Sequence, residues 1–230
     1  MTENEFFEFA CRSAKRATSN FGRIGHLICT QKRSLLELTL REPEMRTAFQ
    51  QEAEHSNVFY GIEVPTRHTY RFTNTANGTT YRRGLIDFAL LDSPSATETP
   101  DVLVELKEGP PNWAQIIQED KSALDDYPKI TKDIHKMSAE PAKSGRCMLH
   151  ICQAADSGTI NALLKKYDAV TQRAMDSAIA TVTRCSGQAC DGWFMLVILV
   201  VHQRGASKGS FIHRYSWAND HWNKSQTVQL

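Results

Sequence analysis

Hydrophobic and polar positions predict helices at the start of the chain and strands after them. Apolar residues cluster at helical spacing over residues 3–57, and Pro43 suits the first turn of a helix that runs to about His55. Strand-like apolar runs follow at 57–65, 69–72, 84–91 and 101–107. The pair Asn77-Gly78 is a turn signal that favours a hairpin before the run at 84–91.

The second half of the chain predicts helices in alternation with strands. Helices are expected from Asn112 to about Tyr127 and over 161–184, and strands at 146–152, 193–202 and, as a short edge strand, 211–217. The strand that starts at Trp193 is apolar throughout, which predicts burial on both faces. Residues 129–145 are rich in lysine and are expected to form an exposed loop or a broken helix. Hairpins followed by crossovers predict an α+β fold, a mixed sheet flanked by helices.

Composition narrows the class of protein. The 230 residues, 41% hydrophobic and 23% charged, are typical of a globular protein that can bury a sizeable core. The formal net charge of +1 gives no overall positive field, so a nucleic acid would have to meet a local basic patch. The start of the chain does not read as a secretory signal, and no apolar run reaches membrane-spanning length. These features predict a cytoplasmic protein without a membrane partner.

The six cysteines give little indication of a metal site. They lie at positions 11, 29, 147, 152, 185 and 190, and no two have Cys-x-x-Cys spacing. Buried free thiols are the favoured interpretation. A zinc or iron–sulfur site built from Cys185 and Cys190 with distant partners is the weaker alternative.

Three charged residues interrupt the apolar strands at 84–91 and 101–107. Asp87 lies in the first strand, and Glu105 and Lys107 lie in the second, where a period of two directs both to one face. Charged groups are rarely placed in such strands unless they are paired or bind a metal. The pattern indicates a divalent-metal phosphodiesterase. The alternative is an exposed edge hairpin whose acids pair with Arg82, Arg83 or Lys107.

A phosphodiesterase would give each of the two carboxylates and the lysine a role. Asp87 and Glu105 would share Mg²⁺ or Mn²⁺, and the backbone carbonyl of Leu106 could add a further oxygen ligand. Lys107 would lie near the attacking water and the scissile phosphate, where it positions the water and offsets negative charge.

Asp87, a hairpin loop and then Glu105-Leu106-Lys107 resemble the PD-(D/E)xK nuclease superfamily, and the order of helices and strands over about 42–202 resembles its α-β-β-β-α-β core. The resemblance implies a restriction-endonuclease-like fold and metal-dependent DNA hydrolysis, with Lys107 as the catalytic lysine. Residues 1–41 would then be a helical N-terminal extension and 42–230 the nuclease-like domain, packed as one compact unit. The residue before Asp87 is isoleucine instead of proline, a position at which the superfamily varies.

The resemblance also implies further site residues. A glutamate from the helix before the first strand would be Glu42 or Glu52, and both stay open. A glutamine or lysine from the helix after the Glu-x-Lys strand would be Gln118, which is preferred over Gln115 and Lys121.

Two basic stretches are candidates for contacts with nucleic acid. The first is interleaved with aromatic residues and contains Arg67, Arg71, Arg82 and Arg83. It predicts either a hairpin along a nucleic-acid groove or a solvated ribbon, and neither is preferred. The second contains Lys129, Lys132, His135, Lys136 and Lys143, and a solvated loop is favoured over a phosphate clamp.

The function that we expect is that of a metal-dependent nuclease with DNA favoured over RNA as its partner. The alternatives are a catalytically silent relative that binds nucleic acid or protein, and a nuclease subunit that is active only in a larger complex. A homodimer is a possible assembly, because double-strand cleavage needs two sites, and so is a larger defence or repair complex. The sequence has no Gly-x-Ser-x-Gly, Walker or Gly-x-Gly-x-x-Gly motif.

Overall fold

The computed structural model describes residues 1–29, 40–74, 78–94, 99–108, 128–153, 157–185, 192–201, 209–219 and 221–230. The helices of this part are α1 (Glu3–Cys29), α2 (Glu42–His55), α4 (Pro128–Ala139) and α5 (Ser157–Cys185). The strands are β1 (Phe59–Asn74), β2 (Gly78–Leu91), β3 (Val102–Glu108), β4 (Gly145–Gln153), β5 (Trp193–Val201), β6 (Phe211–Ala218) and β7 (His221–Gln229).

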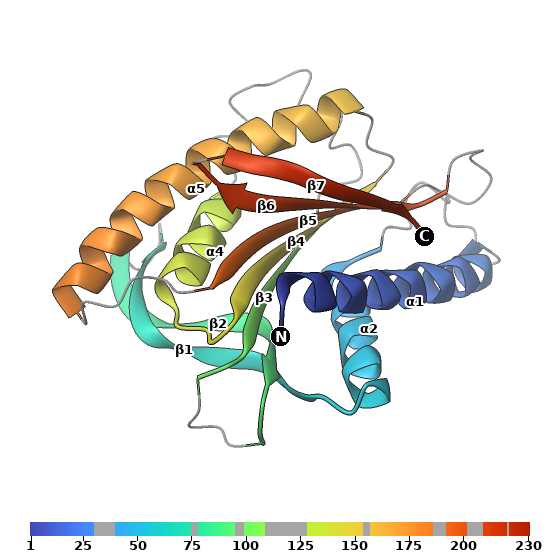
Figure 1. Cartoon of the computed structure of the whole chain (residues 1–230), viewed down its shortest axis with the longest axis horizontal. Helices are drawn as coiled ribbons and strands as arrows, with labels where there is room; N and C mark the ends of the chain where they lie inside the picture. Colours follow the sequence, from blue (N-terminus) through green and yellow to red (C-terminus); the bar gives the residue numbers. More distant parts are fainter. Residues whose placement is uncertain are drawn as a thin grey trace.

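The seven strands form one mixed sheet in the order of the sequence. Strands β1, β2 and β3 are antiparallel, β3, β4 and β5 are parallel, and β5, β6 and β7 are antiparallel again. Parallel neighbours need crossover connections, and α4 and α5 lie in the two crossovers. The predicted α+β class, a mixed sheet flanked by helices, is confirmed (Figure 1).

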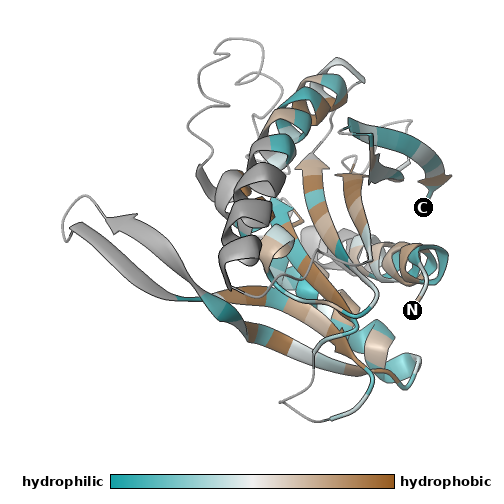
Figure 2. Cartoon of the chain, turned by 60° about the vertical axis from the view of Figure 1, so that its left-hand side comes forward, coloured by the Kyte–Doolittle hydropathy of each residue, from teal (hydrophilic) through white to brown (hydrophobic). Residues whose placement is uncertain are grey.

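Helices cover both faces of the sheet, with α1 and α2 on one face and α4 and α5 on the other (Figure 1). The first layer centres on Phe6, Phe9, Phe49 and Phe88, whose neighbouring rings are as close as 5.4 Å between centroids. Offset and tilted aromatic pairs at such distances add to the stabilisation from buried area. Strand β5 is buried on both faces, as its uninterrupted apolar sequence predicts, and apolar residues dominate the central strands in Figure 2.

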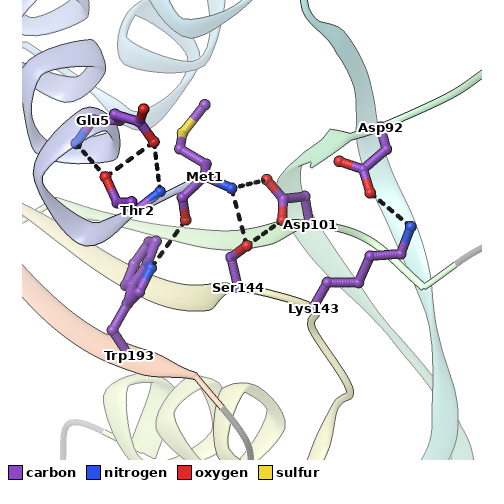
Figure 3. A network of polar contacts seen from close by, with 8 residues as sticks. All are labelled: Met1, Thr2, Glu5, Asp92, Asp101, Lys143, Ser144 and Trp193. Carbon is purple, nitrogen blue, oxygen red and sulfur yellow. Dashed lines mark hydrogen bonds and ion pairs between the residues drawn. The ribbon is translucent and has the colours of Figure 1, made fainter.

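Helix α1 packs into the same core as α2, and polar contacts join Met1, just before the helix, to the beginnings of three strands (Figure 3). The amino group of Met1 donates to Asp101 Oδ2 at 2.8 Å and to Ser144 Oγ at 3.0 Å. Trp193 Nε1 donates to the carbonyl of Met1 at 3.3 Å. Residues at the start of the chain therefore hold the beginnings of β3, β4 and β5 together.

Two predictions about secondary structure need correction. Residues 128–139 form helix α4, and the apolar side chains of Ile130, Ile134 and Met137 are fully buried, so the exposed loop expected for 129–145 is wrong, whereas the helical alternative holds as far as Ala139. Strand β6 is not an edge strand, because it pairs with β5 on one side and with β7 on the other.

Other predictions concern cysteines and membrane helices. Cys147 and Cys152 are buried free thiols, and Cys11 is a half-buried one. The side chains of Cys185 and Cys190, like the helix predicted from Asn112, lie outside the described residues. In the part of the chain that the structure covers, no helix is long and apolar enough to span a membrane.

Candidate active site

Asp87 lies where β2 and β3 separate. The antiparallel pairing of these strands runs from Leu90 opposite Val102 to Phe88 opposite Val104. Just beyond it, the amide of Leu106 donates to Asp87 Oδ2 at 2.8 Å. A side-chain carboxylate thus accepts from a strand amide at the end of the ladder, which fixes Asp87 beside β3.

Glu105 and Lys107 are both buried at the end of β3, with 1% and 9% of their surface exposed. Lys107 Nζ lies 2.8 Å from Asp133 Oδ2 of α4 and 3.6 Å from Glu42 Oε1 of α2. The three residues predicted from the strand pattern are therefore neighbours in one polar cluster. The exposed edge hairpin, the alternative for these acids, is not what forms.

The two candidate glutamates of α2 have different surroundings. Glu42 is the first residue of the helix, and its carboxylate lies near Lys107 and accepts from the amide of Glu108 at 3.2 Å. Glu52 is buried against α1, where it accepts from Arg12 Nε at 2.6 Å and Arg16 Nη2 at 3.2 Å. The structure brings Glu42 into the cluster and leaves Glu52 at the contact between the two helices.

Helix α4 contributes Asp133 and Lys136 to the cluster, and the sequence placed neither of them beside Glu105 and Lys107. Lys136 Nζ lies 2.7 Å from Glu105 Oε1 and 3.1 Å from Asp133 Oδ1, and it donates to the carbonyl of Leu85 at 2.6 Å. Only 12% of the Lys136 side chain is exposed, so the interpretation of this lysine as part of a solvated loop is wrong. The missed signal is the stripe at 130, 134 and 137, which places 133 and 136 beside a buried helix face.

The cluster is buried and rich in negative charge, and the pKa values reflect both facts. Burial raises the pKa of Glu105 well above its usual value, and the nearby charge of Asp133 raises it further against the opposing effect of Lys136. Burial also raises the pKa of Glu42. For Lys107 and Lys136, burial alone would lower the pKa, but the surrounding carboxylates outweigh it and the pKa of each lysine is raised. Both lysines are therefore ammonium ions at neutral pH.

A buried histidine lies beside this cluster on β4. His150 is opposite Lys107 in the parallel register, and its Nδ1 is 2.7 Å from the hydroxyl oxygen of Tyr167 on α5. Burial, with a smaller effect from Lys107, lowers the pKa of His150 to about 3. The imidazole is therefore neutral at physiological pH and adds no second positive charge beside Lys107.

The predicted nucleic-acid contacts lie on the β1–β2 hairpin. The Arg67 guanidinium donates to Thr99 Oγ1 at 2.9 Å, and the side chain of Arg83 is exposed. Arg71 and Arg82 lie on described strands, but their side chains fall outside the description. Gln118, Gln115 and Lys121 belong to residues 109–127, which are not described.

Glu140, the residue directly after α4, holds the backbones of Arg67 and His68. Their amides donate to the two carboxylate oxygens of Glu140, at 2.7 Å and 3.0 Å. This clamp coincides with an irregularity in the β1–β2 ladder between Pro65 and Thr69. The hairpin that carries the basic residues is thereby fixed at the point where its register changes.

Comparisons with known proteins give neither a family nor a function for this chain. Neither a protein-family model, nor a curated protein, nor a solved structure matches the chain.

Proposed function

We propose that this chain is a Mg²⁺-dependent nuclease of the PD-(D/E)xK superfamily, with a restriction-endonuclease-like core, that hydrolyses phosphodiester bonds in DNA. The observation that carries the proposal is the position of Asp87 at the separation of β2 and β3, beside the buried pair Glu105 and Lys107. The antiparallel order β1-β2-β3, the parallel strand β4 and the preceding helix α2 with Glu42 also support it.

The donor chemistry of the cluster suits a hard divalent cation. Glu42, Glu105 and Asp133 lie against the ammonium groups of Lys107 and Lys136. Asp87 is close enough for its charge to raise the pKa of Glu42 and Glu105, so the cluster has a formal excess of two negative charges. Within the described ranges, no three Asp, Glu, His or Cys side chains are arranged to hold one ion together. Mg²⁺ commonly uses only one or two protein carboxylates and keeps several waters, so a closed set of ligands is not required.

Asp87, Glu105 and the carbonyl of Leu106 are the groups that we propose as ligands. A bound Mg²⁺ or Mn²⁺ would supply an activated water and neutralise phosphate charge. Lys107 contributes a fixed positive charge: because its pKa is raised, it donates hydrogen bonds to water or phosphate oxygens and does not act as a base. The Glu42 carboxylate accepts a hydrogen bond from the amide of Glu108 and helps to keep the Lys107 ammonium in place, 3.6 Å away.

The β1–β2 hairpin is the proposed contact with the DNA backbone. Arg67 and the exposed Arg83 lie on it, and arginine guanidinium groups bind phosphate oxygens in a geometry that matches their fork. The choice of DNA over RNA rests on the resemblance in sequence, and parallel incubations with the two nucleic acids test it.

Cleavage assays test the proposal directly. Purified protein is incubated with plasmid DNA, linear DNA and RNA in Mg²⁺ or Mn²⁺, beside Lys107→Met, Asp87→Asn and the control Lys143→Met. Lys143 pairs with Asp92 at 2.7 Å on an exposed surface and lies outside the cluster. We expect the first two variants to lose about 100-fold or more of the cleavage rate, and the control to keep it. Equal cleavage by all four proteins would remove the proposal.

A catalytically silent binding protein is the second candidate, and one observation favours it. Lys136 contacts both Glu105 and Asp133, so these acids have charge partners without any metal. DNA binding without cleavage, together with no Mn²⁺ binding that depends on Glu105, would favour this candidate.

A further inference from the structure

Lys136 has the surroundings of a bound cation. Its ammonium lies within 3.1 Å of three oxygens, which come from Glu105 on β3, Asp133 on α4 and the carbonyl of Leu85 on β2. Carboxylate and carbonyl oxygens are also the ligands that Mg²⁺ and Mn²⁺ prefer. One of the three belongs to Glu105, a proposed metal ligand, so the ammonium and a divalent ion would compete for the same oxygen.

The fold leaves space for this lysine at a glycine. A Cβ atom added to Gly84 on β2 would lie 2.9 Å from Cδ and 3.7 Å from Cγ of Lys136. The stem of the lysine therefore runs across the bare backbone of Gly84 on its way to the acids. The contact of the ammonium with Glu105 is thus supported along the length of the side chain and does not depend on the charged end alone.

The side chain of Lys136 can leave while α4 stays in place. Ile130, Ile134 and Met137 bury the apolar face of α4 in the core, which makes movement of the whole helix costly. The lysine stem, by contrast, has four rotatable bonds, and it regains rotamer freedom when the ammonium is released to solvent. Asp133 keeps its partner Lys107 at 2.8 Å after such a movement.

We propose that Lys136 is a built-in cation that occupies the acidic site in the resting protein, and that a divalent metal binds Glu105 only when this ammonium withdraws. The inference rests on the proposed function, because it concerns access of the metal to the same site. It predicts a protein whose metal affinity is restrained by its own lysine.

Mn²⁺ titration tests the inference without reference to catalysis. Calorimetry and the Mn²⁺-dependent shift in melting temperature are measured for the wild type, Lys136→Met, Gly84→Ala and Lys143→Met, with Glu105→Gln to identify the site. We expect Lys136→Met to bind Mn²⁺ about tenfold or more tightly than the wild type, because a charge-assisted contact no longer opposes the ion. Gly84→Ala keeps the lysine but displaces its stem, so a smaller gain is expected. Lys143→Met should match the wild type, and Glu105→Gln should abolish binding.

The outcomes separate this inference from the nuclease proposal. Unchanged or weaker Mn²⁺ affinity in both Lys136→Met and Gly84→Ala, or no binding in any protein, would overturn the inference. If Lys136→Met does not fold, the affinity of Gly84→Ala decides. Tighter Mn²⁺ binding without cleavage by any protein would support the inference and remove the nuclease proposal. Cleavage with unchanged affinities would do the reverse.

Discussion

The neutral state of buried His150 should make the protein sensitive to mild acid. Its side chain is completely buried, and its pKa is lowered from an ordinary value near 6.5 to about 3. In the unfolded chain His150 binds a proton below about pH 6.5, whereas in the folded protein it stays neutral down to about pH 3. Its contribution to stability is therefore complete above about pH 6.5 and is lost progressively as the pH falls towards 3.

The size of this effect follows from the linkage between proton binding and folding. Each pH unit below the unfolded pKa costs about 1.4 kcal/mol, so the free energy of unfolding should fall by about 2 kcal/mol between about pH 7.5 and about pH 5. That is a substantial part of the 5–15 kcal/mol typical of a folded domain, about an eighth to two fifths. Other groups titrate in the same range, so the measurement needs a variant in which only this histidine is removed.

Urea unfolding of the wild type and His150→Gln at the two pH values isolates the contribution. Glutamine is uncharged and can still bond to the hydroxyl of Tyr167, 2.7 Å from the histidine nitrogen in the native protein. The variant is expected to lose about 2 kcal/mol less than the wild type when the pH is lowered. Equal losses in the two proteins would refute the reasoning, because they would show that His150 is protonated in the folded state or titrates normally.

Two further predictions concern α2 and the start of β4. Glu52→Gln should lower the free energy of unfolding by only about 1–2 kcal/mol, because the two arginine partners of Glu52 are partly exposed and water can solvate them; its Mn²⁺ affinity should be unchanged. Glu42→Gln should instead impair cleavage with little loss of stability. The opposite pattern in melting and cleavage assays would contradict the assignment of Glu42 to the cluster. Gly145→Ala should cost about 3 kcal/mol in denaturant unfolding, because the new Cβ would lie 2.1 Å from the ring of Trp193. Gly209→Ala is the control, since its Cβ would meet only the flexible end of Gln229 at 3.0 Å, and similar losses in both variants would contradict this explanation.

The strands that carry the cluster were predictable because their patterns are local. Apolar runs around Asp87 and around Glu105 and Lys107 fix strand identity, and a period of two fixes which side chains share a face. The position of Glu42 was not predictable to the same degree. It depends on how α2 crosses the sheet, and Glu42 and Glu52 are both acids on one helix with no local feature that ranks them.

The structure of α4 and β7 shows where the sequence misleads. Lysine-rich residues 129–143 suggest a solvated loop, yet lysines are tolerated close to a core when buried carboxylates face them, as Glu105 and Asp133 face Lys136. Strand β7 has a largely exposed, polar sequence, with Trp222 as its buried residue. Its strand conformation comes from pairing with β6, a long-range interaction that hydropathy alone does not report.

One carboxylate ties the basic hairpin to the helix that enters the acidic cluster. Glu140 directly follows α4, and its two oxygens hold the amides of Arg67 and His68, while Lys136 lies one helical turn earlier. The tilt of the hairpin and the placement of Lys136 therefore share a single mechanical support. Under the proposed function, a DNA duplex that displaced the hairpin would also strain the short segment of backbone from which Lys136 projects.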